Sequence, residues 1–236
     1  MADLSYQKPL LITFSGVDGS GKSTQIAGLQ SALHAAGLRT RRLAFWDDVV
    51  VGAKSREGFV HKVYKSESGI GAPGKPVKRR DKNMRGWHLT WSRHVLYLMD
   101  AIRLSYVVAA EQMKVGVDVV IFDRYIYDEL ANLNLVNRFT RWFVTRLIRL
   151  APQPDLAFLL DADPAAAYAR KPEYPVDFMQ KCRVSYHDLA RLQGTLRVIP
   201  ALELPQAKLA VLRIAEQSLA ERGRFVNLVP DNLSLA

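Results

Sequence analysis

The stretch GVDGSGKS, which runs from Gly16 to Ser23 and continues into Thr24, decides the fold of this chain. The apolar run LLITF at positions 10–14 precedes it, and apolar residues at helical spacing follow it. This order predicts a strand, a tight turn and a helix. Glycines allow the turn and let successive N–H groups point inward, where the start of the helix adds partial positive charge. The stretch therefore predicts a phosphate-binding loop at the end of a strand.

The same loop supplies the groups that a nucleoside triphosphate with Mg²⁺ requires. Lys22 is expected to reach the β- and γ-phosphates, and the Ser23 hydroxyl is expected to bind the Mg²⁺ that accompanies them. The sequence therefore predicts ATP and Mg²⁺ as cofactors. The predicted phosphate-binding residues are Gly16, Gly19, Ser20, Gly21, Lys22, Ser23 and Thr24.

Short apolar runs typical of buried strands alternate with helical patterns along the chain. The predicted strands lie at 10–14, 39–46, 117–122, 156–160 and 196–199. After the helix that follows the loop and ends near Gly37, further helices are predicted at 88–115, 126–135, 139–150, 164–170, 176–193 and 205–221. This alternation predicts an α/β fold of the P-loop NTPase type, with a parallel sheet of these strands flanked by helices on both faces. Ligands of such folds bind at the carboxyl ends of the strands.

The chain of 236 residues is expected to form a single domain over residues 1–236, with its core at about 9–222. No Pro/Gly/Ser-rich linker divides it, and no apolar run has the length of a membrane span. The N-terminus also lacks the pattern of a signal peptide. We expect a cytoplasmic protein that has no membrane partner.

Much of the positive charge lies in one segment. The net charge is +10, and the segment from Lys54 to Arg85 holds ten Lys or Arg residues against three acids. Because it is also rich in glycine and proline, it is interpreted as an irregular basic insertion at about 50–86. Its partner is expected to be anionic. A substrate phosphate, an RNA and plain solvent are the alternatives.

A second group of polar residues follows the strand predicted at 117–122. Asp123, Arg124 and Tyr125 come directly after it, at the sheet edge where the phosphate-binding loop opens. An apolar strand that ends in aspartate is typical of the acidic group that organises Mg²⁺ and its waters in P-loop enzymes. Arg124 can grip a phosphate with two hydrogen bonds. The alternative is a surface turn in which Asp123 and Arg124 form an ion pair.

Four collinear motifs resemble the thymidylate kinase family of P-loop nucleoside monophosphate kinases. They are FSGVDGSGKSTQ at 14–25, FDRYIYDELAN at 122–132, LDADPAAAYAR at 160–170 and FMQKCRVSYHDLA at 178–190. The resemblance implies transfer of the ATP γ-phosphoryl group to a nucleoside monophosphate, most directly dTMP to give dTDP. It also implies a homodimer formed through the long apolar helix.

The resemblance further implies roles for individual residues. Lys22 would stabilise the transferring phosphoryl group, and Asp18 would contact the acceptor side. Arg170 would be the first residue of a short lid at about 170–176. Together with Asp123 and Arg124 these are the predicted catalytic residues, and Ser23 and Asp123 are the predicted metal ligands. The predicted substrate-binding residues are Arg103, which lies near the phosphate-binding arginine of the family, and Tyr125, Trp46, Arg79 and Arg80.

The chain departs from the family pattern at three places. FWDD at 45–48 stands where the family carries an arginine that binds the acceptor phosphate. The Tyr-Gln pair with which the family reads thymine falls on Asn132 and Leu133, and the lid is shortened to KPEYP at 171–175. Leucine cannot form the same hydrogen bonds, which leaves other acceptors open.

These departures together suggest that the basic insertion replaces the missing arginine and part of the lid. Its candidate residues are Lys75, Lys78, Arg79, Arg80 and Arg85, with Trp87 or Trp91 as a surface on which a base could stack.

Two other functions remain as alternatives. One is a P-loop phosphotransferase that acts on another nucleoside monophosphate or on a small hydroxylated metabolite. The other is an ATP-binding regulator or RNA-associated protein that uses the basic insertion, although no stable nucleic acid partner is expected. Outside the site, Asp163 is expected to cap the helix that begins at Pro164, and the amphipathic stretch 138–150 is expected to be a packed helix with a basic rim.

Overall fold

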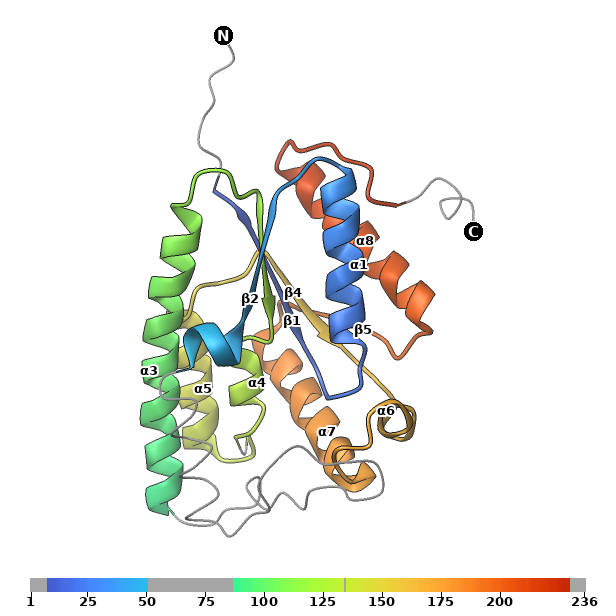
Figure 1. Cartoon of the computed structure of the whole chain (residues 1–236). Coiled ribbons are helices and arrows are strands. Elements are labelled where there is room, and N and C mark those ends of the chain that lie inside the picture. The colour runs from blue at the N-terminus through green and yellow to red at the C-terminus, as the bar shows by residue number, and fades with distance from the viewer. Residues whose placement is uncertain (1–7, 51–86, 134, 230–236) are drawn as a thin grey trace.

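A central parallel sheet organises the chain, as the computed structural model shows for residues 8–50, 87–133 and 135–229, with side chains of the long helix described from Arg93 onward. Its five strands have the order β2-β3-β1-β4-β5, and every neighbouring pair is parallel (Figure 1). The strands are β1 (Leu10–Ser15), β2 (Thr40–Ala44), β3 (Val119–Asp123), β4 (Leu156–Leu160) and β5 (Leu196–Ile199). The predicted α/β fold of the P-loop NTPase type is confirmed.

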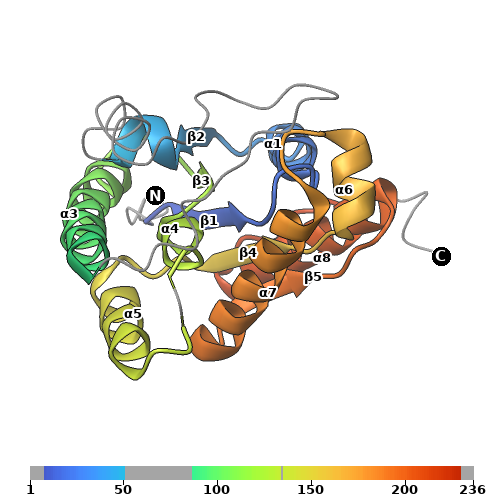
Figure 2. The ribbon, with the colours of Figure 1, turned by 90° about the horizontal axis from the view of Figure 1, so that it is seen from below.

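Helices cover both faces of the sheet, because alternate strand residues point to opposite faces and both sets are apolar. One apolar core lies between the sheet and two helices, α1 (Lys22–Ala35) and α8 (Leu204–Glu221). The other core lies under α3 (Trp87–Gln112), α4 (Ile126–Leu130), α5 (Arg138–Leu150) and α7 (Val176–Gln193). The short helix α6 (Pro164–Arg170) precedes α7 beyond the carboxyl ends of the strands (Figures 1 and 2).

Capping residues fix several helix ends as the sequence predicts. Gly37 has φ 78° just after α1, and the N–H of Leu38 reaches back to the carbonyl of Leu33 at 2.9 Å. The carboxylate of Asp163 accepts the N–H of Ala166 at 2.9 Å, so this residue caps α6. The packed-helix interpretation of 138–150 is also confirmed, because the buried side chains of α5 are Thr140, Val144, Leu147 and Ile148.

The chain after β2 differs from the prediction. The strand ends at Ala44, and a single π-helical turn, η1 (Phe45–Val49), replaces the strand residues expected at 45–46. The carboxylate of Asp48 accepts the N–H of Ala44 at 2.7 Å, and the N–H of Val50 reaches the carbonyl of Phe45 at 3.1 Å. These two bonds turn the chain back on itself and end the strand.

The helix predicted at 126–135 is also shorter than expected. It ends at Leu130, because the side-chain amide of Asn132 donates to the carbonyl of Asp128 at 3.0 Å and takes the acceptor that the helix would need to continue. No helix in the described ranges is long and apolar enough to cross a membrane. Nearly all of the basic insertion lies outside these ranges. Its anionic partner therefore remains a prediction from the sequence.

Candidate active site

The predicted phosphate-binding loop joins β1 to α1 in a path that requires glycine. Gly16 has φ 142°, and a Cβ there would lie 2.5 Å from the carbonyl oxygen of Leu160 at the end of β4. Gly19 has φ 79°, and its Cβ would lie 2.5 Å from the carbonyl oxygen of Ala167 in α6. Positive φ and close backbone contact both disfavour a side chain at these positions. The loop is therefore packed against β4 on one side and α6 on the other.

Lys22 lies inside this loop. Its ammonium group is buried and donates to the carbonyls of Gly16 and Val17, both at 2.8 Å. Burial, reinforced by the nearby charge of Arg124, lowers the pKa of Lys22 to about 8. The lysine thus remains within the loop, where its charge is poorly solvated, and an incoming phosphate would restore the favourable environment that burial removes.

The polar groups around Lys22 fit a phosphate ligand. The side chains of Ser23 and Thr24 are exposed on the first turn of α1. Within the described part of the chain, the Ser20 hydroxyl oxygen is buried without a hydrogen-bond partner. A buried hydroxyl of this kind is costly unless a ligand or water satisfies it. Its position in the loop favours a ligand with oxygen acceptors.

Asp123 and Arg124 lie at the same sheet edge as the loop. Phe14 of β1 is the register partner of Asp123, and the N–H of Arg124 donates to the carbonyl of Phe14 at 2.9 Å. The guanidinium of Arg124 forms an ion pair with Asp18 of the loop and a second one with Asp128 at 3.0 Å. The alternative of a surface turn closed by an Asp123–Arg124 pair is wrong, because each side chain has another partner.

The partner of Asp123 is Arg42, a residue that the sequence interpretation missed. Nη2 of Arg42 lies 2.6 Å from Oδ2 of Asp123. Ala44 of β2 is the register partner of Asp123, and residues two apart on a strand share a face. The pair could have been foreseen only if β2 and β3 had been known to be neighbours.

Charges of opposite sign alternate across the site. Burial tends to raise the pKa of Asp18, but Arg124, Lys22 and Lys171 outweigh it and hold that pKa below its usual value. Burial likewise opposes the charge on Arg124, yet Asp128 and Asp18 raise its pKa above the ordinary value. Asp18 and Arg124 therefore stay charged near neutral pH.

The oxygen groups at this edge fit Mg²⁺ that arrives with a phosphate chain. The Ser23 hydroxyl and the Asp123 carboxylate are hard oxygen donors, which Mg²⁺ prefers together with waters and phosphate oxygens. Across the described ranges, no cluster of three or more His, Cys, Asp or Glu residues could hold a metal ion by itself. The arrangement therefore fits a metal bound mainly through a nucleotide.

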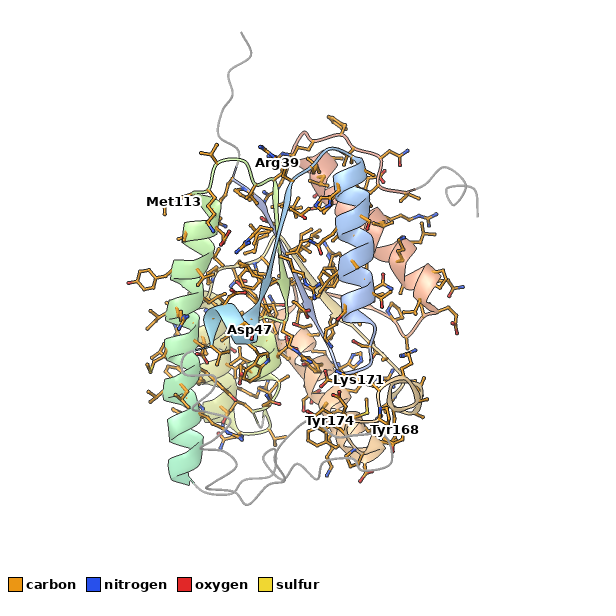
Figure 3. The ribbon with its side chains drawn as sticks, viewed as in Figure 1. Arg39, Asp47, Met113, Tyr168, Lys171 and Tyr174 are labelled. Atoms are coloured by element: carbon orange, nitrogen blue, oxygen red, sulfur yellow. The ribbon has the colours of Figure 1, made fainter. Side chains whose placement is uncertain are left out.

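The segment predicted as a lid lies against the loop. Nε of Arg170, at the end of α6, donates to the carbonyl of Gly19 at 2.9 Å. Lys171 follows it and pairs with Glu173 at 3.1 Å. Figure 3 shows Lys171 below the start of α1, with Tyr168 and Tyr174 on the same side of the molecule. Arg170 and Lys171 thus bring two positive charges close to the loop.

Three curated relatives match most of the chain, whereas no family model matches it. A probable thymidylate kinase of Methanosphaera stadtmanae is 25% identical over 196 residues, which cover 81% of this chain and 89% of the relative. A thymidylate kinase of Ruegeria pomeroyi is 27% identical over 77% of this chain and 82% of its own. A probable thymidylate kinase of Archaeoglobus fulgidus is 23% identical over 89% and 96%. The chain is thus similar to thymidylate kinases over most of its length. The resemblance expected from the sequence is confirmed.

Several residues that the thymidylate kinase resemblance singled out have other places in the structure. Tyr125 was predicted to contact the substrate, but its side chain is fully buried and its hydroxyl donates to the carbonyl of Pro152 at 2.6 Å. Its ring packs against Phe45 and Phe122. Because no part of this side chain is accessible, the predicted substrate contact is corrected to a core position.

The remaining predicted substrate residues are scattered. Trp46 is 40% exposed on η1, and Arg103 is exposed on α3. Leu133, at one of the positions where thymidylate kinases read the base, is buried in the core. Two sets lie outside the described side chains, the cations Lys75, Lys78, Arg79, Arg80 and Arg85 and the aromatic residues Trp87 and Trp91.

Asp128 is a second residue that the sequence interpretation missed. It lies within the FDRYIYDELAN motif, four residues after Arg124, and its carboxylate is buried at the centre of several hydrogen bonds. A spacing of four residues at the start of a helix was the available signal. The signal was weak because an acidic residue there is usually exposed.

Proposed function

We propose that the chain is an ATP-dependent nucleoside monophosphate kinase whose preferred acceptor is dTMP, which it converts to dTDP. The observation that carries this proposal is the meeting of Lys22, Asp18 and Arg124 at one edge of the sheet. The names of the three relatives support the same reaction. Phosphoryl transfer needs this kind of site, because it depends on positioning and on neutralising charge.

The loop would bind the triphosphate of ATP. Its N–H groups would donate hydrogen bonds to phosphate oxygens, and Lys22 would exchange the carbonyls of Gly16 and Val17 for the β- and γ-phosphates. Ser23 and Asp123 would hold the Mg²⁺. When bound, Mg²⁺ offsets negative charge on the transferring phosphoryl group. Lys22 and Ser23 are already part of the loop, whereas Asp123 would first have to part from Arg42.

The acceptor would lie on the side of Asp18 and Arg124. The guanidinium of Arg124 is held by two carboxylates yet stays partly accessible, with 23% of its side chain exposed. It can therefore offer N–H groups to a phosphate that enters beside Asp18. Arg170 and Lys171 would approach the same phosphates from the lid. The basic insertion, with Arg79 and Arg80, would complete the acceptor site in place of the arginine that the family carries after its second strand.

A second candidate acceptor is another nucleoside monophosphate. The observation that favours it is the burial of Leu133, which removes that position from any contact with a base. Base selection would then depend on other groups, for which exposed Trp46 and Arg103 are candidates. The two candidates differ only in the acceptor base, so a comparison of acceptors distinguishes them.

The proposal includes a cytoplasmic homodimer that forms through α3. Exposed apolar side chains recur every three or four residues along this helix, on the side that points away from the core. They are Val95, Leu98, Met99, Ile102 and Tyr106. Figure 3 shows Met113, another exposed apolar residue, just beyond the C-terminal end of α3. A continuous apolar row on one helix face is typical of a surface that another chain covers.

A coupled assay of ADP release tests the proposed activity. Mg-ATP is supplied with dTMP, dUMP, UMP, CMP, AMP or GMP in turn, and Lys22→Met serves as a control for contaminating kinases. We expect kcat/KM for dTMP to exceed that for every other acceptor by about tenfold or more. A preference for a different nucleotide would select the second candidate. Release of ADP that is independent of every acceptor would contradict both.

A further inference from the structure

Arg124 has an unusual backbone conformation. Its φ is 69°, and it is the only residue other than glycine with positive φ in the described ranges. A long, unbranched side chain gains nothing locally from the left-handed region, so the surrounding contacts must compensate for the cost. Conformations of this kind cluster at functional sites. The contacts that hold Arg124 in this conformation therefore indicate its role in the site.

The side chain of Arg124 is held at both ends of its guanidinium. Nη2 pairs with Asp18 of the phosphate-binding loop, and Nη1 donates to Oδ1 of Asp128 at 3.0 Å. Its backbone N–H is fixed by the carbonyl of Phe14 at 2.9 Å. Asp18 belongs to the phosphate-binding loop, and 27% of its side chain is exposed. Asp128 is the partner inside the protein.

The carboxylate of Asp128 is buried and fully hydrogen-bonded. Oδ1 accepts the hydroxyl of Tyr186 at 2.7 Å in addition to Arg124, while Oδ2 accepts the hydroxyl of Ser15 at 2.6 Å and the N–H of Tyr125 at 3.1 Å. Only 5% of Asp128 is exposed. A buried carboxylate is tolerated when it is paired and saturated with donors, and it is then held firmly. Asp128 is thus a fixed point to which Arg124 is attached.

The donors around Asp128 come from separate parts of the site. Ser15 ends β1 immediately before the phosphate-binding loop, and Tyr125 follows β3. Tyr186 lies in α7, the helix that begins directly after the lid segment, and its side chain is buried. The helix of Asp128, α4, packs against α7 beside the central strands (Figure 2). One carboxylate therefore joins the strand that precedes the loop, the turn of Arg124 and the helix that follows the lid segment.

We propose that Asp128 is a positioning residue that sets the direction of the Arg124 guanidinium beside the phosphate-binding loop, under the joint control of β1 and α7. Asp128 does not touch the substrate and acts through Arg124. This role rests on the proposed phosphoryl transfer, in which Arg124 binds a transferring or acceptor phosphate. The position of α7 then becomes one of the factors that set the direction of the Arg124 guanidinium.

Variants of the network distinguish positioning from a purely structural role. Asp128→Asn keeps the shape but removes the charge and turns one acceptor into a donor. Tyr186→Phe removes only the donor from α7. Asp161→Asn is the matched control, because Asp161 also ties a strand end to α7, through Arg183 at 2.7 Å, without contact to Arg124. All three are first compared by thermal unfolding, so that lost stability is measured separately from lost activity.

The kinetic test is a double-mutant cycle with Arg124→Ala. We expect Asp128→Asn to lower kcat by about tenfold or more and to leave KM for ATP within about threefold. In the Arg124→Ala background the same change should cost less than about twofold, because the residue through which it acts is gone. Tyr186→Phe should lower kcat by about twofold to fivefold in the same Arg124-dependent way. An equal loss of kcat in both backgrounds, or no loss, would overturn the positioning role. If Asp128→Asn does not fold, the Tyr186→Phe cycle decides the question.

A second readout needs no turnover. In ¹⁵N spectra the Nε–H signal of Arg124, assigned with Arg124→Lys, should be sharp with slowly rotating Nη groups in the wild type. Asp128→Asn should broaden or average this signal, and Asp161→Asn should leave it unchanged. An Arg124 signal that is indifferent to Asp128→Asn overturns the positioning role even in an active kinase. A wild type that phosphorylates no nucleotide, but whose Arg124 signal responds to Asp128→Asn, overturns the proposed function and leaves the geometric link intact.

Discussion

Nη2 of Arg42 lies 2.6 Å from Oδ2 of Asp123, at the edge of the sheet where the phosphate-binding loop opens. Asp123 is also the carboxylate expected to organise Mg²⁺. The same oxygen cannot serve a guanidinium and a hydrated metal ion equally well, so the two cations compete. About 41% of the Arg42 side chain is exposed, which makes the pair weak enough to open.

This competition predicts an effect of Arg42 on the need for magnesium. Arg42→Gln should lower the Mg²⁺ concentration for half-maximal kinase activity by about twofold to fivefold, which corresponds to an exposed ion pair of up to about 1 kcal/mol. The rate is measured against Mg²⁺ at constant ATP. Arg41→Gln is the control, since Arg41 faces the other side of the strand and lies 3.9 Å from Glu111. A higher magnesium requirement in Arg42→Gln would mean that Arg42 serves the phosphates instead.

The burial of Lys22 predicts an unusual dependence of stability on pH. Its pKa is about 8 in the folded chain and 10.5 as the ordinary value, so between these pH values the unfolded state holds more protons. The free energy of unfolding should therefore rise with pH in this window, by at most about 1.4 kcal/mol per unit. Urea unfolding of the wild type and Lys22→Met at pH 7.5 and 9.5 measures the difference. The wild type should gain about 1–2 kcal/mol relative to the variant over this range.

At pH 7.5, Lys22→Met should be inactive yet at least as stable as the wild type, because a buried charge has been removed. Lys114→Met controls for the loss of one positive charge, since Lys114 is half exposed and pairs with Glu111 at 2.6 Å. Parallel pH profiles for the wild type and Lys22→Met would contradict the burial of a charged Lys22.

Replacing Gly16 by alanine is predicted to weaken nucleotide binding by more than a general loss of stability would explain. Gly16→Ala would bring a Cβ to within 2.5 Å of the Leu160 carbonyl, so the loop must shift and ATP affinity should fall by about tenfold or more. Gly37→Ala is the matched control, because Gly37 has φ 78° but open space around its Cβ. It should cost about 1 kcal/mol, or about 2–4 °C in Tm, with normal ATP affinity. Calorimetric titration with Mg-ATP measures both variants, and equal affinities would contradict the packing of the loop.

The fold could be predicted from the sequence because its signals are local. The strand before Gly16, the glycine after α1 and the cap at Asp163 depend on neighbouring residues, and each of these features appears as expected. The turn after Ala44 was missed because an apolar Phe-Trp pair resembles the end of a strand. The hydrogen bond from the N–H of Ala44 to the carboxylate of Asp48, which forms the turn, is visible only in the structure.

The site could be predicted only in part. Lys22, Asp123 and Arg124 belong to contiguous motifs, and the parallel sheet brings their strand ends together. Arg42 and Tyr186 reach the site from elements far away in the sequence, so only the sheet order and the packing of α7 identify them. Tyr125 follows Arg124 in the motif, yet its side chain points into the core. Whether a side chain points into the core or into the site depends on the turn that carries it.

The apolar row on α3 predicts a dimer that charge can disrupt. Met99→Glu and Ile102→Glu together should convert a dimer to a monomer in light scattering, because two buried carboxylates without partners are strongly unfavourable at an interface. Phe225→Glu is the control, since Phe225 is an exposed apolar residue outside α3. A wild-type protein that is monomeric at all concentrations would contradict the homodimer.

The most direct test of the central claim follows the γ-phosphoryl group itself. Purified wild-type protein is incubated with ATP labelled at the γ-phosphate, Mg²⁺ and dTMP, and the products are separated by ion exchange. If Lys22 and Arg124 form a phosphoryl-transfer site, the label will appear in dTDP, and Lys22→Met will abolish its appearance. Label that stays in ATP, or that is found only in inorganic phosphate, would contradict the account.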